Sequence, residues 1–78
     1  MHRIYVSTVV RFDPEGNITP LWIEWKNGKQ YEIDKILSTE VNASLRPGAN
    51  GYRFQVRILG QERTLGYDGR RWYLDIVD

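Results

Sequence analysis

The sequence contains no cysteine among its 78 residues, and His2 is its single histidine. Without cysteine the chain forms no disulfide, offers no thiolate nucleophile and builds no zinc ribbon. A transition-metal site would depend almost entirely on carboxylates, which are not the ligands that such metals prefer. No serine is accompanied by a base that the sequence places beside it, so nucleophilic catalysis has no support. We therefore expect no catalytic residue, no metal site and no cofactor, and we do not expect an enzyme.

The sequence also lacks a long hydrophobic run and a strong excess of charge of one sign. No apolar stretch approaches the roughly 20 residues that span a membrane. The first residues enter an alternating segment rather than the apolar core of a signal peptide. These absences predict a cytoplasmic protein with no membrane partner. The formal net charge of +1 is well below that of a dedicated nucleic-acid-binding domain, so attraction for a polyanion must come from a local patch.

Hydrophobic and polar residues alternate with a period of two along most of the chain, which predicts β-strands. We expect six strands, at residues 3–12, 20–25, 29–37, 52–59, 63–67 and 70–77, most of them joined by short turns. The length predicts a single domain, residues 1–78. An antiparallel meander with one apolar face has to curl over that face. The expected fold is therefore an all-β, SH3-like barrel or roll, with an OB-like barrel as the alternative.

Two turns in the second half of the chain predict which residues face the core. Gly60-Gln61 and Asp68-Gly69 are both suited to two-residue hairpin turns. Counting outward from them gives one consistent inner face, formed by Phe54, Val56, Ile58, Leu65, Tyr67, Trp72, Leu74 and Ile76.

The turn around Asn27-Gly28 is better explained with three residues, 26–28, than with two. A three-residue loop with a bulge places Ile23 opposite Tyr31, and all the neighbouring apolar residues then share one face. Trp22 then points outward. Residues 38–50 are harder to interpret, because they fit either a strand that continues past a bulge or a short helical turn from Ser38, followed by a loop at 46–48.

The outward face of the last three strands is the candidate nucleic-acid surface, formed by Arg53, Arg57, Arg71 and Tyr73. Arginines that flank an exposed aromatic ring suit a phosphate backbone with a stacked base. The alternative is a solvated sheet face, since outward strand positions must be polar and such cross-strand pairs stabilise a sheet by themselves.

Trp22 is the candidate protein-interaction residue. Tryptophan is enriched at binding hot spots, and Glu24 and Glu32 beside it would repel a phosphate backbone. An exposed strand edge could serve the same purpose by β-augmentation. The structural alternative is that Trp22 packs under residues 38–50 or under the N-terminal strand. We expect a monomer or weak self-association.

Three segments carry a resemblance to other proteins: PLWIEWKNGKQYEIDKIL, GYRFQVRILG and RRWYLDIV. They are similar to a group of short uncharacterised proteins of Gram-positive anaerobes, over residues 9–77, with the pattern P-L-x-I-x-W-x-x-G-x-x-Y-x-I-D-K near the start. More loosely, the chain resembles an unannotated domain appended to Y-family polymerase-like proteins. The resemblance implies a bacterial protein and, by association alone, favours nucleic acid. It supplies no functional residues. The sequence thus predicts a non-enzymatic binding module, for single-stranded nucleic acid or, alternatively, for a protein.

Overall fold

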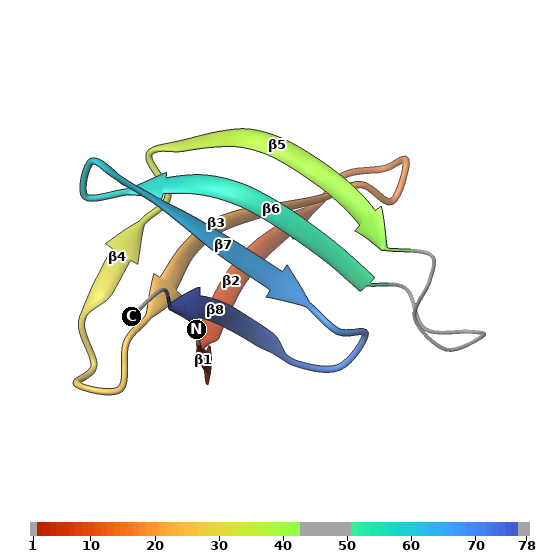
Figure 1. Ribbon diagram of the computed structural model, residues 1–78. Helices are drawn as coiled ribbons and strands as arrows, with labels where there is room; N and C mark the ends of the chain where they lie inside the picture. The colour runs from red at the N-terminus through yellow and green to blue at the C-terminus, as the bar shows by residue number, and fades with distance from the viewer. Residues whose placement is uncertain (1, 43–50, 77–78) are drawn as a thin grey trace.

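The computed structural model of the chain describes residues 2–42 and 51–76. These residues form eight antiparallel strands in two sheets, which confirms the all-β class (Figure 1). The larger sheet has the order β1-β8-β7-β6-β5 and the smaller one the order β2-β3-β4. The strands are β1 (His2–Tyr5), β2 (Ser7–Phe12), β3 (Ile18–Glu24), β4 (Gln30–Glu32), β5 (Lys35–Asn42), β6 (Gly51–Ile58), β7 (Gln61–Tyr67) and β8 (Trp72–Ile76).

The prediction of six strands was wrong because two of the predicted strands are each divided between the sheets. The first breaks at Val6, whose N–H donates to the Trp72 carbonyl at 3.0 Å. The second breaks at residues 33–34, where the Asp34 N–H donates to the Arg57 carbonyl at 2.8 Å. The sequence hides the first break, because the period of two continues across Val6 toward one shared core. At the second break the period is interrupted, since Ile33 and Ile36 both pack against the core although they are three residues apart.

The predicted turns between β6, β7 and β8 were wrong in position. The first turn is Leu59-Gly60, with φ of 53° and 74°, and it places Ile58 opposite Gln61. The second connection covers residues 68–71 and places Leu65 opposite Leu74. Each pairing differs from the prediction by two residues. A shift of two keeps every side chain on its own face, so the predicted inner face is still correct.

The bulged turn at residues 26–28 is confirmed. Ile23 pairs with Tyr31, and the Trp25 N–H donates to the Lys29 carbonyl at 2.8 Å. Gly28 has a φ of 84°, the left-handed conformation that this turn requires and that glycine adopts without strain. Trp22 lies opposite Glu32, on the outward face as predicted.

Strand β5 decides between the alternatives for the segment after residue 37. It runs on to Asn42 past an irregularity between Ile36 and Ser38, so the strand with a bulge is correct over residues 38–42 and the helical turn is wrong there. Residues 43–50, including the loop expected at 46–48, lie outside the described part of the chain.

The core lies between the two sheets. In Figure 1, β2 and β3 run behind β6 and β7. The buried cluster contains Ile23 from the smaller sheet together with Phe54, Val56, Ile58, Leu65 and Leu74 from the larger one. The strands described here form no closed barrel. Residues 2–42 and 51–76 also contain no helix long and apolar enough to cross a membrane.

Candidate functional site

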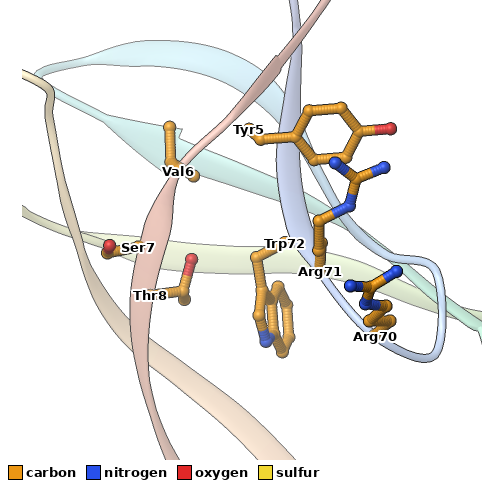
Figure 2. Close-up of a pocket in the computed structure, with 7 residues that line it drawn as sticks. All are labelled: Tyr5, Val6, Ser7, Thr8, Arg70, Arg71 and Trp72. Atoms are coloured by element: carbon orange, nitrogen blue, oxygen red, sulfur yellow. The ribbon is translucent and has the colours of Figure 1, made fainter.

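A groove of about 490 Å³ lies where the bend between β1 and β2 passes the loop between β7 and β8 (Figure 2). Its lining combines aromatic, hydroxyl and cationic side chains: Tyr5, Val6, Ser7, Thr8, Arg70, Arg71 and Trp72. We call it the arginine groove. It is within the size range of small-ligand sites, and no acidic side chain is part of its lining.

The 68–71 loop is held by the carboxylate of Asp68. Its Oδ1 atom accepts hydrogen bonds from the backbone N–H groups of Arg70 at 2.9 Å and of Arg71 at 2.7 Å. The Asp68 N–H in turn donates to the Arg71 carbonyl at 3.1 Å. Asp68 therefore fixes the backbone that carries both arginines, although the arginine side chains themselves are exposed.

The Arg71 side chain covers the ring of Tyr5. The guanidinium carbon lies 3.7 Å from the ring centroid, which is a close cation–π contact. Figure 2 shows this pair at the rim of the groove, with Arg70 beside it. Tyr5 is still 45% exposed. No ion pair within the described residues engages Arg70 or Arg71, so both charges are available to a ligand.

A second arginine–tyrosine pair lies beside the first, and its arginine is engaged by a carboxylate. Arg3 covers the ring of Tyr73 at 3.7 Å, and its Nε lies 3.3 Å from Asp75 Oδ1. Burial is the largest influence on the pKa of Arg3 and lowers it, but the hydrogen bond to Asp75, together with the electrostatic interactions with Tyr73 and Asp75 and a hydrogen bond to Tyr5, outweighs burial, so the pKa is raised. Because Asp75 compensates the charge of Arg3, this pair stabilises the sheet instead of attracting anions.

Of the four residues predicted for nucleic-acid binding, Arg71 alone lines the arginine groove. Tyr73 was expected as an exposed ring, but it is only 6% exposed because Gly66, Arg3 and Tyr5 surround it. The prediction of an exposed Tyr73 ring was therefore wrong, and this ring offers no face on which a base can stack.

The other two arginines lie on β6, away from the groove. Arg53 is half-buried opposite Gly66, and its Nε is covered and has no hydrogen-bond partner within the described residues. Arg57 lies opposite Glu62 on one side and Lys35 on the other.

Two residues of the groove, Tyr5 and Arg70, were not assigned a role from the sequence. The alternation in residues 3–12 does place Tyr5 on the outward face. What the sequence does not reveal is that β1 pairs with β8, which brings Tyr5 opposite Tyr73. Pairing between strands so far apart in the chain leaves no local signal.

Trp22, the predicted protein-interaction residue, is half-buried between Val9 and Glu32 on the outward face of the smaller sheet. Its indole Nε1 is covered and has no hydrogen-bond partner in the described part of the chain. Trp22 therefore lies beside β2, which is part of the N-terminal segment. Its neighbour there, Val9, is 37% exposed.

The described residues contain no group of three or more His, Cys, Asp or Glu side chains that could hold a metal ion. In the polar turn at 13–17, the Asp13 carboxylate accepts hydrogen bonds from the backbone of the turn itself. Asp13 Oδ1 accepts from the N–H groups of Glu15 at 3.0 Å and Asn17 at 2.8 Å. These hydrogen bonds, with that from Asn17 first, lower the pKa of Asp13.

The Asp68 carboxylate predicts a dependence of stability on pH. Hydrogen bonds from the Arg71 and Arg70 amides lower its pKa in the folded chain. Its contribution is therefore present above the unfolded pKa, about 3.9, and is lost as the pH falls through the folded value. We expect Asp68→Asn to show a smaller loss of stability on acidification than the unsubstituted protein. Urea denaturation on either side of about pH 4 measures it.

A matched variant, Asp13→Asn, tests whether the change in acid sensitivity of Asp68→Asn arises in the 68–71 loop. Its carboxylate has a lowered pKa in a separate turn, so we expect the two substitutions to act independently and their effects to add. An unchanged acid response in Asp68→Asn would contradict the role assigned to this carboxylate.

Comparison with known proteins finds no matching family model, no matching curated protein and no matching solved structure. The resemblance noted from the sequence therefore stays a prediction.

Proposed function

We propose that this protein is a non-enzymatic module that binds single-stranded nucleic acid weakly at the arginine groove. The observation that carries the proposal is the Arg71–Tyr5 stack, with Arg70 beside it, for which residues 2–42 and 51–76 supply no ion-pair partner. A base can stack on the guanidinium plane or on the exposed part of the tyrosine ring, as bases do on single-strand-binding proteins. The two guanidinium groups can bind neighbouring phosphates, and Ser7 adds an exposed hydroxyl.

Asp68 supports this proposal, because a prearranged loop lowers the cost of ordering a binding site. Its carboxylate keeps the two arginine backbones in place before a ligand arrives. Two phosphate contacts imply modest affinity. For a single strand, the slope of log K against the logarithm of the salt concentration is then about −1.4. The low net charge of the chain agrees with weak binding.

The test is a titration of ¹⁵N-labelled protein with a short single-stranded DNA of mixed sequence, at low and then physiological salt. We expect amide shifts around residues 5–8 and 68–72, which weaken as salt increases. Arg70→Glu with Arg71→Glu is expected to lower the affinity by about tenfold.

The control carries the same change in charge on arginines outside the groove, Arg11→Glu with Arg57→Glu. We expect it to retain most of the affinity. Equal losses in both double variants would mean diffuse electrostatic attraction, and the absence of shifts in the groove would refute the proposed site.

The fold is compatible with this role in a specific way. We propose that the two sheets form an SH3-like roll, in which the chain bends from one sheet to the other at Val6 and at residues 33–34. Small rolls of this kind present their loops and sheet ends as binding surfaces, and the arginine groove lies at such an end.

Protein binding through Trp22 or a strand edge is the second candidate. Edge strand β5 exposes 66% of Val41, and Val9 is exposed beside Trp22. The coverage of the indole nitrogen makes Trp22 a weaker anchor than a fully exposed ring. Loss of a partner in Trp22→Ala with an unchanged spectrum would favour this candidate, whereas loss of the fold would make Trp22 structural.

A further inference from the structure

A second groove, of about 330 Å³, lies at the other end of β8 from the arginine groove. Its lining is mostly apolar and includes Ile23, Trp25, Leu59, Leu74 and Ile76, together with Arg63. We call it the apolar groove. Ile23 and Leu74 belong to the buried core, so the lining of the groove includes the edge of the core between the two sheets.

Leu59 at the rim of this groove has a strained backbone. Its φ of 53° is a conformation that two-residue hairpin turns usually fill with Asn, Asp or Gly. The side chain is 73% exposed, so the strain is not offset by burial in the folded chain. Strained residues concentrate at binding sites, and here the strain holds an apolar side chain over an apolar groove.

The charged side chain in the lining of the groove is the cation Arg63. Arg63 lies on the inward face of β7 opposite Val56, and its Nη2 donates to the side-chain oxygen of Gln61. No ion pair within the described residues engages Arg63. Lys26 lies over the Trp25 ring at 5.9 Å from the centroid. No acidic side chain among the described residues lines the groove.

From this arrangement we infer that the apolar groove binds a small amphipathic carboxylate, of the kind represented by a medium-chain fatty acid. The aliphatic chain lies against Ile23, Leu74 and Ile76, and Leu59 covers it from the rim. The carboxylate pairs with the guanidinium of Arg63, which makes a charge-assisted hydrogen bond of the strong type. This site is independent of the proposed nucleic-acid function, because the two grooves share no residue.

The experiment compares octanoate, octylammonium and octanol as probes, and binding is followed by amide shifts, including that of the Trp25 indole N–H. We expect octanoate to bind more tightly than octylammonium, with shifts at residues 58–63 and 74–76. Arg63→Gln is expected to lower the affinity for octanoate by about tenfold while leaving that for octanol unchanged. Arg11→Gln, at an exposed arginine outside both grooves, is the matched control, and it is expected to leave the affinity for octanoate unchanged.

A second variant keeps the test informative if Arg63→Gln disturbs the fold. Leu59→Asn fits the turn better, so we expect a higher melting temperature together with weaker octanoate binding. Equal affinity for octanoate and octylammonium, or shifts confined to other parts of the chain, would overturn the inference. An unchanged octanoate affinity in Leu59→Asn would remove the role assigned to the strained residue.

Discussion

Replacing Phe54 with alanine is expected to lower the free energy of unfolding by about 3–5 kcal/mol, the range found when a buried phenylalanine ring is removed. The side chain is 1% exposed, and its ring stacks on Trp72 and Tyr52 at 5.8 and 6.1 Å between centroids. A chain of 78 residues has a total unfolding free energy of roughly 4–12 kcal/mol. The substitution therefore removes a large part of the total, and we expect a marginally folded protein.

Urea denaturation measures this loss, with Phe12→Ala as the control. Phe12 is 67% exposed at the end of β2, so its replacement is expected to change the stability by no more than about 0.5 kcal/mol. Similar stabilities for the two variants would contradict a core shared between the sheets.

Replacing Gly66 with alanine is expected to destabilise the protein by about 1–3 kcal/mol, the usual range for overpacking. A Cβ at this position would overlap the ring and hydroxyl of Tyr73. The ring has little freedom to move away, because Arg3 covers one face and Tyr5 meets it edge-on at 6.3 Å. We expect the upper part of this range for that reason.

A double-mutant cycle with Tyr73→Ala tests the cause. If the overlap is responsible, Gly66→Ala destabilises the Tyr73→Ala background much less than it destabilises the unsubstituted protein. Additive losses from the two substitutions would show that the contact with Tyr73 is not the reason.

The inner face of β6, β7 and β8 was predicted correctly from the sequence, although neither of the two hairpin registers was. Parity explains this outcome, because each observed turn shifts the predicted pairing by two residues and so leaves Leu65 and Leu74 pointing inward. The signal for the first turn was misleading, since Gly60 serves as the second central residue after Leu59, a residue type that seldom adopts positive φ.

The candidate site was only partly predictable, because its geometry depends on contacts between distant parts of the chain. Arg71 was identified from its place among aromatic residues, and it does lie on a tyrosine, but that tyrosine is Tyr5 rather than Tyr73. Tyr73 was expected to be exposed, since alternation assigns a face and says nothing about what covers that face. Here β1 covers it with Arg3.

The pairing of β1 with β8 also has a mechanical consequence. The register places His2 opposite Ile76 and Tyr5 opposite Tyr73, so tension applied at residues 2 and 76 acts at the same end of the ladder. Because antiparallel hydrogen bonds lie perpendicular to the strands, such a pull opens them one after another instead of shearing them together. The chain would therefore yield at low force by peeling β1 away. Arg3 would separate from β8 first and Tyr5 would follow. The contact between Tyr5 and Arg71 would then be lost while strands β5 to β8 stayed paired.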